Sequence, residues 1–213
     1  MLRAVLLLAL LGAAPAAGED PARNDPARDA WRAIDQLRRE LAASGTLSAD
    51  FVQTYTPAGF TTGESESGRL ALSAPDCLRF DYSDPYRKSF LVCGSRAWSW
   101  VEGEPRGQRA TIDASREMGL DLLLLPAAQL AARYRATASS LRDGELAVAL
   151  EPRAADAPLV AADLAIAPGG SRLAALDYRD REGNVTSFRF SNWRALADAD
   201  VFAPPAEVEW TEP

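Results

Sequence analysis

The most restrictive feature of this sequence is an alternation of apolar and polar residues on both sides of Asp84-Pro85. Successive side chains of a strand point to opposite faces of a sheet, so the alternation predicts a β-hairpin centred on that turn. In this register Cys77 lies opposite Cys93, and Phe80 lies opposite Phe90. The two cysteines share one face. The other face carries the apolar residues Leu78, Phe80, Tyr82, Phe90 and Val92.

The opposed cysteines predict a disulfide. Directly opposed Cβ atoms lie ~4.5–5.5 Å apart, which is within reach of a bridge after a modest adjustment. A bond between Cys77 and Cys93 would close a loop of ~15–17 residues and contribute ~3 kcal/mol in the chain-entropy account. The alternative is a pair of free cysteines that behave as small buried hydrophobes.

The N-terminus has the pattern of a secretory signal peptide. Arg3 precedes an apolar run, and Ala14-Pro15-Ala16 supplies a cleavage site. We expect a signal peptide at residues 1–17 and a single domain at residues 18–213. No cysteine follows the apolar run as an acylation site, so we expect a soluble exported protein, where disulfides persist. A eukaryotic secreted protein is the alternative, since Asn184-Val-Thr186 is a formal glycosylation sequence.

Composition excludes several functions. The chain has no histidine, which removes Ser-His-Asp and Cys-His catalysis and zinc sites that use imidazole. Lys+Arg 23 against Asp+Glu 30 argues against nucleic acid. We therefore expect no enzyme, no metal and no cofactor. A carboxylate-based hydrolase remains the alternative from another class, with Asp81 and Asp84 as the available acids, although solvated turn residues are the simpler interpretation.

The rest of the chain predicts an α+β fold. Residues 29–44 are expected to form a helix with Asp29 as N-cap and an apolar stripe that includes Ile34 and Leu37. A two-residue period then predicts roughly ten or eleven strands in a strongly curved antiparallel sheet with helices on one face. Residues 117–134 interrupt the strands as an apolar helical segment around Leu123. This segment is either a buried core helix or a lid over an apolar site.

Leu70 and Leu72 are expected to extend the apolar face of the hairpin on the preceding strand, and Trp98 and Trp100 on the following one. An ordinary core covered by helices is the alternative interpretation of this face. Several segments in order decide between the two: residues 48–53 (Ser-Ala-Asp-Phe-Val-Gln), residues 68–72 followed by a proline, Leu78-Arg-Phe-Asp-Tyr82, and Phe202-Ala-Pro-Pro205 with Val208.

Together these segments resemble the LolA family, the periplasmic carriers of outer-membrane lipoproteins. The resemblance implies an unclosed half β-barrel with a helical lid over an apolar cavity. It implies a monomeric periplasmic carrier that takes acylated lipoproteins from an inner-membrane ABC exporter to an outer-membrane acceptor. The missing acylation cysteine fits the soluble carrier rather than the membrane-anchored acceptor of the same fold. The residues expected to line the cavity are Phe51, Leu70, Leu72, Leu78, Phe80, Tyr82, Phe90, Val92, Trp98, Trp100 and Leu123.

The sequence departs from the family pattern at one position. Many members carry an arginine directly before the proline of the second strand, where it is thought to hold the lid, and this chain has Ala74 there. Arg69 and Arg79 are the candidates to replace it. The cysteine pair is also not a general family feature. Both departures leave open a carrier or sensor of another amphiphile, such as a polyene or a glycolipid.

Overall fold

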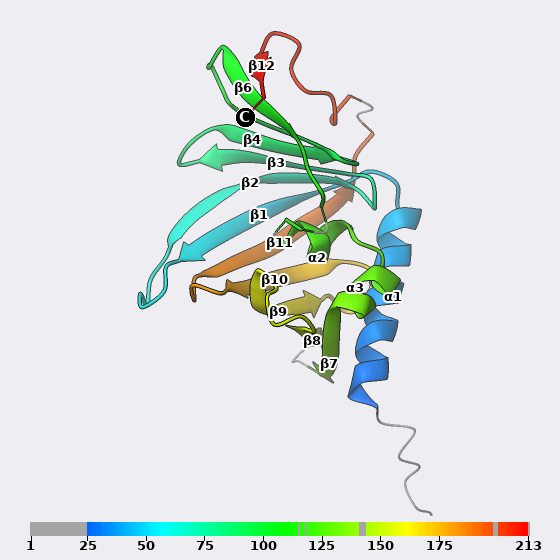
Figure 1. Cartoon of the computed structure of the whole chain (residues 1–213). Coiled ribbons are helices and arrows are strands. Elements are labelled where there is room, and N and C mark those ends of the chain that lie inside the picture. The colour runs from blue at the N-terminus through cyan, green and yellow to red at the C-terminus, as the bar shows by residue number, and fades with distance from the viewer. Residues whose placement is uncertain (1–24, 115, 118, 141–143, 198–199, 213) are drawn as a thin grey trace, which may run out of the picture.

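The computed structural model describes residues 25–114, 116–117, 119–140, 144–197 and 200–212. The predicted signal peptide at residues 1–17 lies outside the described residues. The described chain forms one 12-stranded sheet in the order β12-β6-β5-β4-β3-β2-β1-β11-β10-β9-β8-β7. Figure 1 shows this sheet curving around the helices without closing into a barrel. The predicted fold class is therefore confirmed.

The sheet consists of two meanders, β1 to β6 and β7 to β11, which join where β1 pairs with β11. The strands are β1 Leu47–Thr56, β2 Glu64–Ser73, β3 Cys77–Asp84, β4 Lys88–Cys93, β5 Arg96–Val101, β6 Arg106–Thr111, β7 Tyr134–Ser140, β8 Leu146–Pro152, β9 Leu159–Ile166, β10 Leu173–Asp180, β11 Val185–Ala195 and β12 Glu209–Thr211. The helices are α1 Pro26–Ala43, α2 Leu120–Leu124 and α3 Ala127–Arg133. Neighbouring strands pair antiparallel, except that the short β12 pairs parallel with β6.

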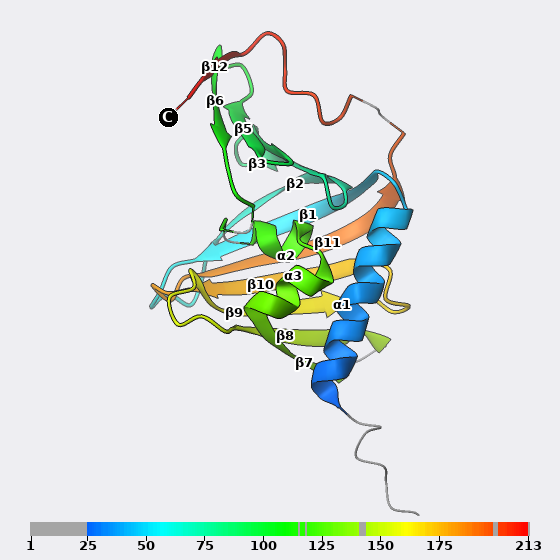
Figure 2. The same ribbon diagram turned by 45° about the vertical axis from the view of Figure 1, so that its right-hand side comes forward.

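Helix α1 begins earlier than the sequence predicted. Asp25, not Asp29, is the N-cap, and its side chain accepts hydrogen bonds from the backbone N–H groups of Ala27 and Arg28. Pro26 takes the first helical position, where its missing N–H costs nothing. The buried face of the helix carries Ala30, Ile34, Leu37 and Leu41, and Figure 2 shows this helix and the two short helices on the same side of the sheet.

The predicted helical segment at residues 117–134 is two short helices. α2 ends before Leu125, which is extended, and Pro126 is the N-cap of α3. Tyr134, expected inside the helix, already belongs to β7. The proline causes the break because it lacks the N–H that would continue the ladder of α2.

The hairpin of β3 and β4 has the predicted register. Cys77 pairs with Cys93, Phe80 with Phe90, and the other partners follow. Cys77 and Cys93 form a disulfide across a Cα–Cα distance of 4.2 Å. The disulfide lies on the outer, convex face of the sheet, and the aromatic alternation points inward to the concave face.

Trp98 and Trp100 do not lie on the predicted face. The tight turn at Gly94-Ser95 pairs Cys93 with Arg96, which places Trp98 opposite Leu91 and Trp100 opposite Ser89, both on the convex side. Ala97 and Ser99 take the concave positions instead. The expectation failed because it continued the apolar face across the turn without fixing the register of β5.

On the convex side Trp100 belongs to a separate packed layer. Its ring meets Trp210 of β12 edge-on at 5.9 Å, and the guanidinium of Arg79 lies over it at 5.1 Å. Arg79 also donates to the carbonyl oxygen of Val201 at 2.9 Å. This bond holds the segment after β11 against the convex face, and Leu91 is fully buried there.

Candidate functional site

The concave face has an aromatic floor. The ring of Phe51 meets Phe80 at 5.0 Å, Phe80 meets Phe188 at 5.4 Å, and Phe188 stacks with Phe190 at 5.8 Å. Phe188 and Phe190 from β11 were not predicted as site residues, although the alternation Phe-Arg-Phe at 188–190 carries the same signal as the hairpin. The antiparallel register of β1 with β11 places these rings beside Phe51.

Aliphatic residues continue the floor toward α1. Leu70 pairs with Phe80 and Leu72 with Leu78 across β2 and β3, and Val92 faces Leu78 from β4. All four aliphatic residues are almost fully buried. The structure thus brings together every predicted cavity residue of β1 to β4. Trp98 and Trp100 lie outside this floor, but Trp100 is among the lining residues of a larger open basin and Trp98 of a smaller one.

Leucines of the helices fill the space above this floor. Leu122 and Leu123 of α2 share a pocket with Leu37 of α1 and with Leu70 and Leu72 of the sheet. The free volume left in that pocket is about 10 Å³, about the size of one water, and its mainly apolar lining offers a water few hydrogen-bond partners. Leu122 and Leu123 therefore pack closely against the apolar floor.

Arg38 of α1 ties α1 to α2. Its guanidinium donates to the carbonyl oxygen of Leu123 at 2.5 Å and to that of Leu122. Burial lowers the pKa of Arg38 to about 10, and the nearby charge of Asp121 opposes that shift. Arg38 therefore stays a cation at neutral pH, and its charge faces the carbonyl end of α2, where a cation is favourable.

The two arginines expected to replace the family arginine cannot reach the lid. Arg69 pairs with Asp81 across β2 and β3, on the convex face. Arg79 lies on that face too, bonded to Asp81 at 2.8 Å. The expectation for both was wrong because side chains at odd positions of these strands point away from the cavity.

A buried polar cluster ties α2 to the start of β7. Asp121 is 2% exposed; its carboxylate accepts a hydrogen bond from the Tyr134 hydroxyl at 2.6 Å and lies 3.6 Å from Nε of Arg133. Burial raises the pKa of Asp121, against the hydrogen bonds and the charge of Arg133. Helix α2 therefore holds an ionisable group whose charged form is disfavoured by burial.

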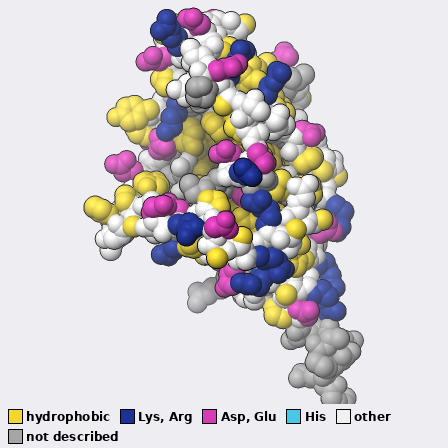
Figure 3. Space-filling view, in the orientation of Figure 1, with side chains coloured by type: hydrophobic (Ala, Val, Ile, Leu, Met, Phe, Trp, Pro, Cys, Tyr) yellow, Lys and Arg dark blue, Asp and Glu magenta, His cyan; other side chains and the backbone are white. Residues whose placement is uncertain are grey.

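Beyond the lid the concave face is open. A basin of about 620 Å³ lies over β3 to β6, with Tyr82, Lys88, Phe90 and Val101 among its lining residues. That volume falls in the usual range of ligand pockets. A smaller basin of about 200 Å³ adjoins it, and Phe90 lines both. Figure 3 shows hydrophobic side chains gathered in a hollow on this side of the molecule.

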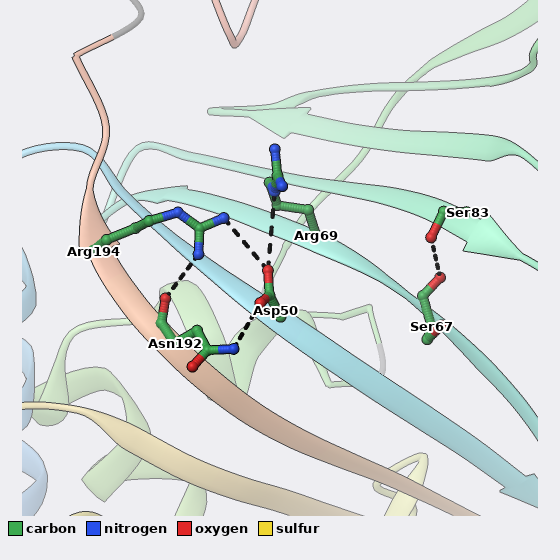
Figure 4. Close-up of polar contacts among 6 residues, drawn as sticks. All are labelled: Asp50, Ser67, Arg69, Ser83, Asn192 and Arg194. Atoms are coloured by element: carbon green, nitrogen blue, oxygen red, sulfur yellow. Dashed lines mark hydrogen bonds and ion pairs between the residues drawn. The ribbon is translucent and has the colours of Figure 1, made fainter.

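A network on the convex face fixes the strands beneath the floor. Figure 4 shows Asp50 between Asn192, Arg194 and Arg69. Asn192, which has a positive φ of 54°, donates to Asp50 at 2.9 Å, and this bond is the main reason that the pKa of Asp50 is lowered. The network pins β1 to β11 where their pairing shifts, and so holds Phe51 beside β11.

The acids of the alternative hydrolase hypothesis, Asp81 and Asp84, do not lie in the cavity. Asp81 accepts from Nε of Arg79 at 2.8 Å and from the Ser89 hydroxyl at 2.6 Å, on the face away from the cavity. Asp84 ends β3 at the exposed turn. Within the described ranges no three acidic or cysteine side chains converge as metal ligands.

Comparison with known proteins decides the family. The family described as "Outer membrane lipoprotein carrier protein LolA" matches residues 42–204. The chain belongs to the LolA family. Its relatives include the outer-membrane lipoprotein carrier protein of Xanthomonas oryzae pv. oryzae, 31% identical over 185 residues, with 83% of this chain and 85% of the relative covered. That of Chromobacterium violaceum is 29% identical over 182 residues, with 83% and 86% covered.

Solved structures confirm the fold of this LolA-family chain. An uncharacterized conserved protein from Thermus thermophilus aligns with a TM-score of 0.55 and 13% identity, over 87% of this chain and 99% of that one. A putative outer membrane lipoprotein-sorting protein domain from Vibrio parahaemolyticus aligns with a TM-score of 0.50 and 13% identity, over 83% and 97%. At such identity the likeness concerns the fold alone.

Proposed function

We propose that this LolA-family chain is a periplasmic carrier that binds the acyl chains of lipoproteins on its concave face. The observation that carries the proposal is the occupation of the apolar floor by Leu122 and Leu123 of the lid. These leucines cover a surface that acyl chains would cover equally well. Lid opening would exchange one apolar cover for another.

Such an exchange gives the affinity that a carrier needs. Each buried methylene contributes ~0.8 kcal/mol, so ten of them contribute about 8 kcal/mol before costs, on the order of micromolar binding. Opening the lid opposes this gain because the leucines lose their contacts. A moderate net affinity lets the cargo leave at its destination. The carrier performs no bond chemistry, which suits a chain without histidine.

The carrier would travel between two membranes as a monomer. It would receive lipoproteins from an inner-membrane ABC exporter and pass them to an outer-membrane acceptor. The naming of its relatives as outer-membrane lipoprotein carrier proteins supports this route. In the described part of the chain, no helix is long and apolar enough to cross a membrane.

A carrier or sensor of another amphiphile is the second candidate. One observation favours it: the arginine that contacts α2 is Arg38 of α1. The strand position before Pro75, where many family members carry an arginine, holds Ala74. The disulfide at Cys77 and Cys93 is a further departure from the general family pattern. A polyene or a glycolipid would fit the same apolar floor.

Lipid extraction and mass spectrometry of the purified mature protein test the proposal. Acylated peptides in the extract are the expected result, followed by micromolar binding of a synthetic triacylated lipopeptide to the delipidated protein. A glycolipid or polyene in the extract would select the second candidate. Failure to bind any acyl ligand after delipidation would contradict both.

A further inference from the structure

The concave face changes from apolar to polar at its open end. Gln53 pairs with Glu66 across β1 and β2, and Tyr82 pairs with Lys88 across β3 and β4. Side chains of paired residues share a face. Tyr82 also lies on the same face as Phe80, because the two residues are two positions apart on β3. Gln53, Glu66, Tyr82 and Lys88 therefore form a polar collar at the rim of the aromatic floor.

Direct contacts connect the collar. The Lys88 ammonium lies 2.7 Å from Oε1 of Glu66 and 4.7 Å from the centre of the Tyr82 ring. The Tyr82 hydroxyl donates to Oε1 of Gln53 at 2.5 Å. Burial raises the pKa of Tyr82, and the charge of Glu66 adds to that effect. Tyr82 therefore stays neutral and orients the Gln53 amide.

The collar keeps donors for a ligand. An ammonium has three N–H donors and a primary amide has two. Glu66 accepts from Lys88 with Oε2 at 3.0 Å, and its Oε1 lies 2.7 Å from the same ammonium. The Gln53 amide nitrogen has no protein partner among the described residues. The Lys88 side chain is 41% exposed and lines the open basin. At least one donor of Lys88 can face that basin.

The depth of the collar matches the junction of an acyl chain with its headgroup. Tyr82 meets Phe51 edge-on at 5.0 Å, so the collar lies directly next to the aromatic floor. A chain lying on the floor would bring its terminal carbonyl to the collar. Ester and amide carbonyls are neutral acceptors, and the paired charges of Lys88 and Glu66 suit a neutral group better than an anion.

We propose that the collar binds the ester or amide carbonyl oxygens at which acyl chains join the polar part of the cargo. Lys88 and Gln53 donate, and Glu66 and Tyr82 hold these donors in place. The inference rests on the proposed function, because it requires acyl chains on the concave face. It adds a means to fix the depth of the cargo and to distinguish acylated molecules from plain hydrocarbon.

Two matched lipopeptides test the collar. One carries two ester-linked chains on its glyceryl group, and the other carries ether-linked chains of the same length, which lack the carbonyl oxygens. Wild-type protein should bind the ester form more tightly than the ether form. Lys88→Met should remove that preference by lowering the affinity for the ester form on the order of tenfold. Binding of the ether form should stay unchanged, which shows that the variant is folded. Arg135→Met, at an exposed residue of β7 that pairs with Glu151 and does not line the basin, is the matched control.

The outcomes separate the two proposals. If neither lipopeptide binds wild-type protein, the proposed function fails and the collar with it. If both bind equally, or if Lys88→Met weakens both equally, the collar is structural and only this inference is overturned. If Lys88→Met does not fold, Gln53→Leu replaces it in the same titrations of the ester and ether lipopeptides. An ester-linked glycolipid titrated in parallel distinguishes the possible cargoes. If Lys88→Met weakens binding of the glycolipid and the lipopeptide equally, the collar binds acyl carbonyls in general. If the variant weakens binding of the lipopeptide alone, the collar is specific for lipoproteins.

Discussion

Arg38 on α1 donates a hydrogen bond of 2.5 Å to the carbonyl oxygen of Leu123 on α2. The same guanidinium donates to Leu122, so one side chain of the first helix holds the leucines that cover the apolar floor. The lid is thus fastened through the backbone of α2, while its side chains take the place proposed for acyl chains.

Removing this contact should ease lid opening. Arg38→Met keeps the aliphatic stem but leaves two buried carbonyls without a donor, at about 1–3 kcal/mol each. A ligand that binds only the open form then binds more tightly, because that form is more populated. We expect about a tenfold gain in affinity for a fluorescent fatty acid, measured by titration.

Arg39 provides the matched control for this experiment. It neighbours Arg38 on α1, but it is exposed and pairs with Asp35 one turn away. Arg39→Met should leave the affinity unchanged, since surface ion pairs of this kind contribute little. An equal gain in both variants would show that helix stability, not the lid contact, governs binding.

Lid opening should also depend on pH through Asp121. Burial raises the pKa of this carboxyl in the closed structure above its ordinary 3.8. An acid with a raised pKa stabilises the closed form below its ordinary pKa, and this stabilisation is lost as the pH rises through the raised value. The lid should therefore open more readily toward neutral pH.

Hydrogen-exchange protection of α2 measures this dependence. Protection should fall from acid toward neutral pH in wild-type protein, and Asp121→Asn should flatten the profile because the amide does not titrate. Arg38, Arg133 and Tyr134 face the carboxyl, but arginine and tyrosine side chains do not change charge in this window. An unchanged profile in the variant would assign the titration to another group.

Phe90 and Phe80 should respond differently to truncation. Phe90 is half-buried at the open basin, so Phe90→Ala should weaken fatty-acid binding severalfold with a small loss of stability.

Phe80 is 5% exposed in the closed core, so Phe80→Ala should lower the free energy of unfolding by about 3–5 kcal/mol. Phe60→Ala, at a loop residue that is 68% exposed, serves as the control. Unaltered binding by the Phe90 variant would place the cargo elsewhere.

The disulfide should matter for stability and not for cargo. Replacing Cys77 and Cys93 by alanine should lower the free energy of unfolding by about 3 kcal/mol in urea denaturation. The pair lies on the convex face, away from the floor, so fatty-acid affinity should remain within about twofold by the same titration. A large loss of affinity in a folded double variant would mean that the bridge shapes the cavity.

The hairpin register could be predicted from sequence because alternation on both sides of Pro85 allows only one symmetric pairing. The face of Trp98 could not, because it depends on the two-residue turn at Gly94-Ser95, which pairs Cys93 with Arg96. Arg38 gave no signal either, since a cation on an amphipathic helix normally faces water. Its role arises only when α2 is packed against α1, a contact that no local pattern encodes.

Hydrogen exchange of residues 120–124 with and without a bound triacylated lipopeptide shows whether the cargo displaces α2 from the apolar floor. If acyl chains replace Leu122 and Leu123 on the floor, the amides of α2 should lose protection on loading while those of β1 and β3 keep theirs. Unchanged or increased protection of α2 in the loaded protein would mean that the lipopeptide binds without displacing Leu122 and Leu123, and that the proposed exchange on the floor does not occur.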